Sequence, residues 1–410
     1  MADALLSGLD MVRFCAYYVF GWIYSVLSFI YKSILNKFTN RQSIVFISFP
    51  DISDNSLHLF LYINQHYESY DLVWLCADLK ASQHKLVALG SLSERNRILL
   101  VKKNSILGLL HFAKAKVVFH THGTYFFTRK AYQSCVVNLW HGMQIKTVGY
   151  LDNKSKYDVA YCDYTISTST FHRTKMAQAF GLDESRVLLS GQPRNDVLLQ
   201  PSKVAQTQFY SAFNVALDNE IIFWLPTYRV SNVGDIRVDS NSTSFMADFA
   251  EDFLHEINHD LAKNKQTLII KLHPMDIENG NTCLCGAEFS NIRILNQKAW
   301  ETSPIELYQA LAFSSGLISD VSSVIIDYVV TQKPIAIVKQ AVWDYSRGFV
   351  PGLSKIDFLN EFYNIKDIKT FKEFMFFSKV ANPKQASQLF NEFEYKRISS
   401  SAYIAQVFIK

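Results

Sequence analysis

Short apolar runs alternate with longer amphipathic segments along the chain from residue 43 onward. In the first half, the runs are rich in β-branched and aromatic residues and have the length of buried strands. They lie at 43–49, 71–76, 97–101, 116–121, 135–140, 163–167 and 186–190. Segments such as 56–66 and 106–115 separate them and carry apolar residues at helical spacing. This alternation predicts a parallel sheet with helices on both faces.

A second set of alternating runs begins after Gly191-Gln192-Pro193-Arg194-Asn195-Asp196 and Pro201, which interrupt the pattern. Its strands are predicted at 220–226, 266–274, 291–296, 316–320 and 333–338. We therefore predict two doubly wound α/β domains that face each other across a cleft, residues 41–200 and 201–410. The last stretch, 384–410, looks helical and is expected to pack back on the first domain.

Residues 1–40 form a separate hydrophobic unit. Residues 14–31 carry no charge and many Tyr, Trp and Phe side chains, which suit a membrane interface. The basic residues that flank this stretch are Arg13, Lys32, Lys37 and Arg41. We predict a membrane-associated helix that either spans the bilayer or lies flat in one leaflet; a helix packed on the protein is the alternative. If it spans, its basic flank places the rest of the chain in the cytoplasm.

Composition narrows the classes of function. The chain of 410 residues has a formal charge of +4, too small to indicate nucleic-acid binding. Neither G-x-G-x-x-G nor G-x-x-x-x-G-K occurs, which argues against dinucleotide enzymes and P-loop NTPases, and we predict no cofactor. The six cysteines are scattered, and Cys283 and Cys285 lack a second ligand pair, so we predict no metal site. Of His120 and His122, we expect one to be buried with a hydrogen bond and the other to line the cleft.

The candidate chemistry of the first half lies at the end of the apolar run that begins at Val136. The run stops at Trp140-His141-Gly142, where a titratable side chain is followed by the residue that best allows a tight turn. Ligands of open α/β sheets bind at the carboxyl ends of strands, and Lys146 adds a positive charge close by. A histidine that only completes a turn is the alternative interpretation.

Several predicted strands of the second half end in polar residues suited to an anion. The residues at these strand ends are Thr227 and Arg229, His273, and Asp320 followed by Ser322 and Ser323. Two serines at a helix start offer hydroxyls, backbone N–H groups and the helix dipole to a phosphate. A plain serine N-cap is the alternative. Convergence of these residues on one sheet edge favours a phosphate pocket.

These motifs resemble those of the CDP-glycerol glycerophosphotransferases of teichoic-acid and capsule synthesis. The matching pieces keep the family's order and spread over residues 135–350. They are Trp140-His141-Gly142 with Lys146 and Gly149, Gly191-x-Pro193-Arg194-Asn195-Asp196, Pro226-Thr227-Tyr228-Arg229, Lys271-Leu272-His273-Pro274, and Ser319-Asp320-Val321-Ser322-Ser323-Val324 with Asp327-Tyr328. Val321 stands where the family usually has a tyrosine. The resemblance implies a GT-B-like fold, in agreement with the two predicted domains.

The resemblance also implies roles for individual residues. His141 and His273 are the expected catalytic residues, with His141 as the base that deprotonates an acceptor hydroxyl. The expected donor-binding residues are Thr227, Arg229, Lys271, Ser322, Ser323 and Asp327. The residues expected on the acceptor side or in the cleft are Lys146, Arg194 and Asp196.

The predicted reaction is metal-independent transfer of glycerol phosphate from CDP-glycerol to a lipid-linked or polymeric acceptor, with release of CMP. The expected partners are CDP-glycerol, this acceptor and the cytoplasmic face of the cell membrane, and no nucleic acid. A different alditol in the donor, such as ribitol, stays open. The rival interpretations are a GT-B glycosyltransferase that uses a nucleotide sugar and a non-catalytic scaffold of a polymer-synthesis complex.

Overall fold

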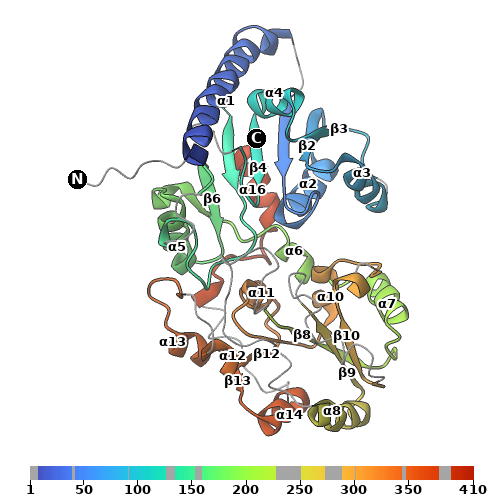
Figure 1. Ribbon diagram of the computed structural model, residues 1–410. Coiled ribbons are helices and arrows are strands. Elements are labelled where there is room, and N and C mark those ends of the chain that lie inside the picture. Colours follow the sequence, from blue (N-terminus) through green and yellow to red (C-terminus); the bar gives the residue numbers. More distant parts are fainter. Residues whose placement is uncertain are drawn as a thin grey trace, which may run out of the picture.

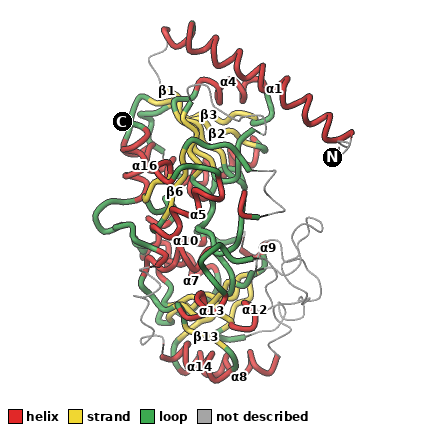
Figure 2. The backbone as a smooth tube through the Cα atoms, turned by 90° about the vertical axis from the view of Figure 1, so that its left-hand side faces the viewer, coloured by secondary structure: helices red, strands yellow, loops and turns green. Residues whose placement is uncertain are grey.

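The computed structural model of the protein has two lobes, each built on a parallel β-sheet (Figure 1). It describes residues 8–38, 42–90, 92–125, 134–152, 159–227, 251–272, 289–300, 302–343, 348–377 and 389–410. The two groups of strands lie one above the other along the long axis of the molecule (Figure 2). The predicted class of two parallel-sheet α/β domains is confirmed. Arg229 and His273 lie outside the described residues.

The sheet of the first lobe has the strand order β3-β2-β1-β4-β5-β6-β7, and neighbouring strands pair in parallel. Its strands are β1 (Gln42–Ile47), β2 (Tyr70–Cys76), β3 (Arg97–Lys102), β4 (Val117–His120), β5 (Cys135–Asn138), β6 (Tyr164–Ser167) and β7 (Val187–Leu189). The central strands are buried along almost their whole length, because helices cover both faces of the sheet. Continuous burial explains why the strands appear in the sequence as unbroken apolar runs.

The sheet of the second lobe has the order β10-β9-β8-β11-β12-β13, again with parallel pairs. Its strands are β8 (Glu220–Leu225), β9 (Gln266–Lys271), β10 (Ile292–Leu295), β11 (Gly316–Ser319), β12 (Ile335–Val338) and β13 (Tyr363–Ile365). The edge strand β13 was not predicted from the sequence. The strand is so short that its sequence shows no periodicity by which it could be distinguished from a loop.

Helices connect many of the consecutive strands in both lobes. Those of the first lobe are α2 (Asp54–His66), α3 (Leu79–Ala88), α4 (Ile106–Lys114) and α5 (Thr170–Phe180). After α6 (Asn195–Leu198), those of the second lobe are α7 (Lys203–Ala212), α8 (Glu251–Lys263), α9 (Gln297–Trp300), α10 (Leu307–Phe313), α11 (Ser323–Tyr328), α12 (Lys339–Trp343), α13 (Lys355–Asn360) and α14 (Ile368–Phe377). Several begin after a side chain that accepts a backbone N–H of the first turn: Asp78, Ser105, Ser169 and Ser202. These caps fix where each connection ends and its helix starts.

The C-terminal helix α16 (Ser400–Phe408) lies on the first lobe, next to α2 (Figure 1). The Phe408 ring contacts those of Phe119 in β4 and Tyr164 in β6. Lys116 Nζ donates to the Ile409 carbonyl at 2.8 Å. The described chain therefore crosses between the lobes near α6 and again before α16. A continuous cluster of buried apolar side chains also runs from the first sheet into β8 and α11, so the lobes share part of their core.

The N-terminal helix α1 (Gly8–Ser33) packs against α4 at the far end of the first lobe (Figure 1). On its inner face, the Tyr24 ring lies 5.5 Å from the Phe112 ring of α4. Within the described ranges, the segment Cys15–Phe38 is the one helical stretch long and apolar enough to cross a membrane by length and composition.

Candidate active site

The turn after β5 presents His141 at the carboxyl edge of the first sheet. Asn138 ends the strand, and its Oδ1 accepts a hydrogen bond from the Trp140 N–H at 2.9 Å. Asn55 Nδ2, from α2, donates to the Trp140 carbonyl at 3.0 Å. Trp140 and Gly142 have φ angles of 49° and 136°, so the backbone turns sharply on both sides of His141. These contacts fix the backbone that carries the histidine.

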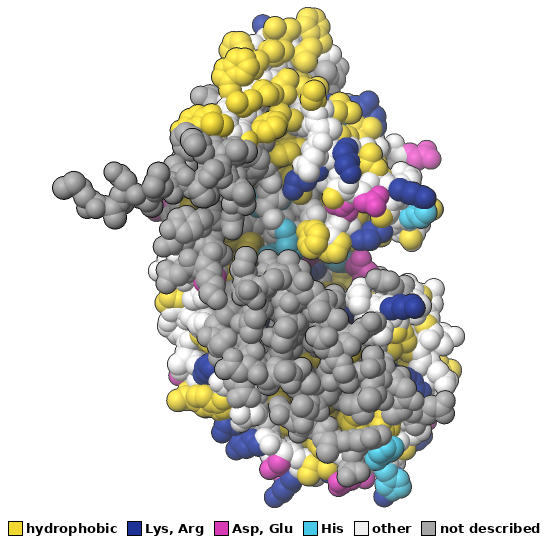
Figure 3. Space-filling view, viewed as in Figure 1, with side chains coloured by type: hydrophobic (Ala, Val, Ile, Leu, Met, Phe, Trp, Pro, Cys, Tyr) yellow, Lys and Arg dark blue, Asp and Glu magenta, His cyan; other side chains and the backbone are white. Residues whose placement is uncertain are grey.

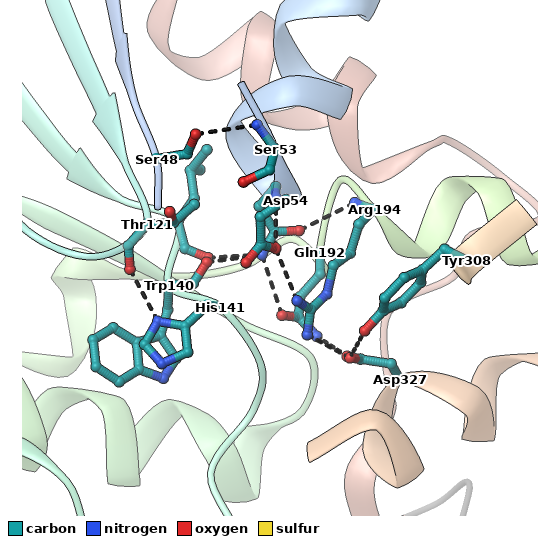
Figure 4. Close-up of polar contacts among 12 residues, drawn as sticks. Ser48, Ser53, Asp54, Thr121, Trp140, His141, Gln192, Arg194, Tyr308 and Asp327 are labelled. Atoms are coloured by element: carbon teal, nitrogen blue, oxygen red, sulfur yellow. Dashed lines mark hydrogen bonds and ion pairs between the residues drawn. The ribbon is translucent and has the colours of Figure 1, made fainter. Parts of the chain in front are cut away.

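The His141 ring is held by the end of the neighbouring strand β4 (Figure 4). Its Nδ1 lies 3.1 Å from the carbonyl oxygen of Thr121. A carbonyl can only accept, so Nδ1 carries the proton of the neutral ring and Nε2 is the basic nitrogen. The ring also lies against that of Trp140, with 4.0 Å between centroids and an interplanar angle of 34°. The fold thus selects the tautomer that a general base with a reactive Nε2 needs.

The same turn touches the second lobe. A Cβ atom at Gly142 would lie only 2.4 Å from the Ser323 hydroxyl oxygen, so the close approach requires glycine. Ser323 begins α11, and Ser322 is its N-cap, with a hydroxyl that accepts a backbone N–H of the first turn at 3.4 Å. The structure therefore brings His141 and the two predicted serines together where the carboxyl edges of the sheets meet. Figure 3 shows a notch between the two lobes on the right of the view.

Arg194 joins the two lobes through a buried network (Figure 4). Its guanidinium group bonds the carboxylate of Asp54, at the start of α2, at 2.8 Å and that of Asp327, in α11, at 2.5 Å. Asp327 also accepts hydrogen bonds from the Tyr308 hydroxyl at 2.5 Å and from Gln192 Nε2. Asp327 is completely buried and Arg194 nearly so. Two of the predicted residues, Arg194 and Asp327, thus meet as partners across the lobes.

The charges in this network keep one another ionised. Burial alone would lower the pKa of Arg194, but the carboxylates of Asp327 and Asp54 raise it above its usual value. Burial alone would raise the pKa of Asp54, but the charge of Arg194, and those of His141 and His122, lower it. Arg194 and Asp54 therefore both stay charged near neutral pH, directly beside the His141 turn.

Two predicted donor-binding residues lie at neighbouring strand ends of the second lobe. Thr227, after β8, donates from its backbone N–H and from Oγ1 to the Asp320 carboxylate, the latter at 2.9 Å. Lys271 is the last residue of β9; it is buried, and burial lowers its pKa to about 8. Thr227 stands two residues before Arg229, and Lys271 stands two residues before His273. Both Arg229 and His273 lie outside the described ranges.

Asp196 and Lys146, both predicted on the acceptor side or in the cleft, contact neighbouring chain segments. The Asp196 carboxylate accepts from the Ser400 and Ser401 N–H groups at 2.7 and 2.9 Å, and so caps the C-terminal helix α16. Lys146 forms an antiparallel β-bridge with Phe349, which joins the segment after the His141 turn to the second lobe. Asp196 therefore holds the last helix on the first lobe, and the bridge of Lys146 holds the two lobes together near the site.

The two histidines at the end of β4 differ in environment, as predicted. His120 is fully buried, its Nδ1 accepts a hydrogen bond from the Gly123 N–H at 3.1 Å, and burial lowers its pKa to about 3. His122 is exposed and lies against His141. Among the described residues, no group of three or more His, Cys, Asp or Glu side chains could hold a metal ion. Cys283 and Cys285 lie outside those residues.

Sequence reasoning missed several residues of the site, namely Asp54, Asn55, Thr121, Gln192 and Tyr308. Asp54 and Asn55 open α2, the helix that follows β1, so the polar start of this helix was a usable signal. Tyr308 had no such signal, because it reaches Asp327 from the first turn of another helix.

Comparisons with known proteins agree with these motifs. The model of the family described as CDP-Glycerol:Poly(glycerophosphate) glycerophosphotransferase matches residues 29–386. The chain is 24% identical over 327 residues to a teichoic acid poly(glycerol phosphate) polymerase of Staphylococcus epidermidis. The aligned region covers 75% of this chain and 41% of the relative. It is 23% identical over 326 residues to a teichoic acid glycerol-phosphate transferase of Staphylococcus aureus, which covers 73% of this chain and 75% of the relative.

A solved structure extends the comparison to the fold. The wall teichoic acid polymerase TagF matches with a TM-score of 0.68 and 17% sequence identity over 97% of this chain and 96% of that one. At this identity, the likeness concerns the fold. The chain spans less than half the length of the polymerase of Staphylococcus epidermidis that it matches.

Proposed function

Because this chain belongs to the CDP-glycerol:poly(glycerophosphate) glycerophosphotransferase family, we propose that it transfers glycerol phosphate from CDP-glycerol to an acceptor hydroxyl and releases CMP. The acceptor is a membrane-linked molecule or a growing teichoic-acid or capsule polymer. The observation that carries the proposal is the His141 ring, fixed by Thr121 with Nε2 as its basic nitrogen, next to Ser323 of the opposite lobe.

In the proposed reaction, His141 acts on the acceptor. As the acceptor oxygen forms a bond to the phosphorus of the glycerol phosphate group, Nε2 takes the hydroxyl proton. The bond from that phosphorus to the bridging oxygen of the pyrophosphate breaks, and CMP leaves with the electron pair. The Thr121 carbonyl accepts from Nδ1 throughout, and it stabilises the imidazolium that forms.

The donor pyrophosphate is proposed to lie along the carboxyl edge of the second sheet. Lys271 supplies a polar group there, and Ser322 and Ser323 supply hydroxyls at the start of α11. Arg229 and His273, which lie outside the described residues, are the further donor-side groups that the family resemblance implies. These groups neutralise the charge that spreads over the phosphoryl oxygens, so the proposed reaction needs no divalent ion. Thr227 orients the end of β8 through Asp320.

A donor screen on the detergent-extracted full-length protein tests this proposal. Release of CMP and a product heavier by one glycerol phosphate are expected with CDP-glycerol. Product formation with a nucleotide sugar instead would indicate a glycosyltransferase, and no turnover with either donor in the presence of acceptor would favour a scaffold. CDP-ribitol in the same screen determines the alditol.

The His141→Ala variant tests the base within the same assay. Turnover should fall by roughly 10²–10⁴-fold, the usual contribution of a general base. His84→Ala, which changes an exposed histidine on α3, is the matched control and should retain turnover. Near-normal turnover of His141→Ala would remove this residue from the mechanism.

We further propose that α1 attaches the protein to the cytoplasmic face of the membrane and lies flat in the interface. Hydrophobic side chains gather at the end of the molecule over α1 (Figure 3). Trp22 and Phe29 on its outer face are 68% and 71% exposed, whereas Tyr24 and Tyr31 on its inner face are buried. A helix that spanned the bilayer would have to leave α4 and expose that inner face. Because one face of α1 is buried against the protein and the other is exposed, the flat arrangement is favoured.

A further inference from the structure

A second imidazole lies against the proposed base. The rings of His122 and His141 are stacked, with 4.0 Å between centroids and an interplanar angle of 10°. His122 follows β4 and His141 follows β5, two strands that pair side by side. The structure thus places two titratable rings face to face at the carboxyl edge of the first sheet.

Thr121 holds both rings. Its backbone carbonyl accepts from His141 Nδ1 at 3.1 Å, and its hydroxyl oxygen lies 2.8 Å from His122 Nδ1. The same residue thus engages both Nδ1 atoms, and the two rings lie as nearly parallel plates. The stack is therefore a fixed arrangement and not a chance contact of two mobile side chains.

Stacked imidazoles compete for a proton. In water, the repulsion of two like charges at this distance would weaken binding of the second proton roughly fivefold, and partial burial strengthens the repulsion. The two rings therefore titrate as a coupled pair, in which the first proton disfavours the second. His122 is exposed and His141 is half-buried, so the first proton is better solvated on His122.

We propose that His122 is a positioning residue for the transfer reaction: it keeps the His141 ring in its stacked orientation and takes up protons that would otherwise block His141. This role rests on the proposed function of His141 as the base. As the solution becomes acidic, His122 is protonated first, and its charge keeps His141 neutral and able to accept the acceptor proton.

Other charged groups lie near the pair. Asp54, at the start of α2, attracts protons to them, and its charge is partly neutralised by Arg194 at 2.8 Å. The Arg194 guanidinium also lies close to Gly142, 3.0 Å from the position of a Cβ atom there. Lys103, after β3, acts on the buried and neutral His120. Replacing His122 leaves all these groups in place, so the effect of the stacked ring can be isolated.

The test is the pH dependence of turnover in His122→Phe, which keeps an aromatic ring in the stack but cannot be protonated. The acid limb should move to higher pH by about 0.7 unit or more, which means about fivefold more loss of turnover than wild type between pH 8 and pH 5. The matched control is His66→Phe, because His66 is an exposed histidine stacked on Tyr62 at the other end of α2, with 4.1 Å between centroids. Its acid limb should not move.

Overlapping acid limbs of His122→Phe and wild type would overturn the proposal. A loss of turnover that is equal at every pH would also overturn it, since that result means a structural contact alone. Thermal unfolding of both variants checks that each is folded before the profiles are compared.

A second readout does not depend on the donor. Diethylpyrocarbonate modifies neutral imidazoles, and mass spectrometry of the modified full-length protein follows each histidine separately as the pH is lowered. Modification of His141 should stop at a higher pH in His122→Phe than in wild type, and an unchanged midpoint contradicts the proposal. If CDP-glycerol is no substrate but this shift occurs, the proposed function fails while the coupling of the two rings stands.

Discussion

Removing Arg194 should destabilise the protein far more than removing an exposed basic residue. Arg194→Met leaves Asp327 completely buried and without its cationic partner, although the Tyr308 hydroxyl and the side-chain amides of Gln192 and Asn195 still donate to it. The variant also removes the ion pair with Asp54. The charge left behind is the main source of the expected effect, because a buried carboxylate without a counter-charge is strongly disfavoured.

The magnitude follows from the burial of the network. Removing one partner of a buried ion pair costs about 3–5 kcal/mol in the free energy of unfolding. We expect the lower end, about 3 kcal/mol, because three hydrogen bonds to Asp327 remain. The double variant Arg194→Met/Asp327→Asn replaces the unpaired carboxylate with a neutral amide and should recover about half of that loss.

Urea unfolding of the wild type, the two single variants and the double variant measures these differences in one cycle. Lys265→Met is the matched control, because its ion pair with Asp218 has similar geometry at 2.9 Å but both side chains are largely exposed. The control should leave the free energy of unfolding almost unchanged. A loss below about 1 kcal/mol for Arg194→Met, or a double variant no more stable than that single variant, would refute the reasoning.

Three further predictions concern the turn, the metal and the membrane. Gly142→Ala should cut turnover at least tenfold, because its Cβ would meet the side chain of Ser323 on a backbone with φ of 136°. A fully active variant would contradict the contact. Turnover with CDP-glycerol should survive EDTA, and complete loss that one divalent ion restores would reveal a metal site. The double variant Trp22→Ser/Phe29→Ser should sediment less with anionic vesicles but keep its melting temperature, because both side chains are exposed on the outer face of α1. Tyr24→Ser, on the buried face of α1, should lower the melting temperature instead. Unchanged vesicle binding in the double variant would contradict the flat attachment.

The sequence was sufficient for most of the fold because the strands are parallel and buried on both faces. The run predicted at 43–49 corresponds to β1 (Gln42–Ile47), and the run at 266–274 contains β9 (Gln266–Lys271). Such strands are continuous apolar runs and do not alternate between apolar and polar residues, so local composition predicts them well. The short strand β13 was missed for the opposite reason, since it is defined by its pairing with β12 and not by its own composition.

The site was predicted only in part, and distance along the chain explains which part. His141 and Ser323 stand at strand ends beside a glycine or a second serine, so local sequence points to them. Asp54 contributes through Arg194, 140 residues later in the chain, and a single sequence contains no signal for that pairing. The burial of Asp327 between Arg194 and Tyr308 is likewise a property of the assembled lobes.

The position of the proposed base depends on the second lobe as much as on the first. His141 is oriented by Thr121 of its own sheet, but the next residue, Gly142, rests directly on Ser323 at the start of α11. Asp327 lies in that same helix and is held to the first lobe by Arg194. Any displacement of α11 therefore moves the serines, the ion pair and the turn that carries His141 together. The Trp-His-Gly and Ser-Ser motifs, although more than 150 residues apart in the sequence, thus act as one structural unit whose spacing is set by direct contact.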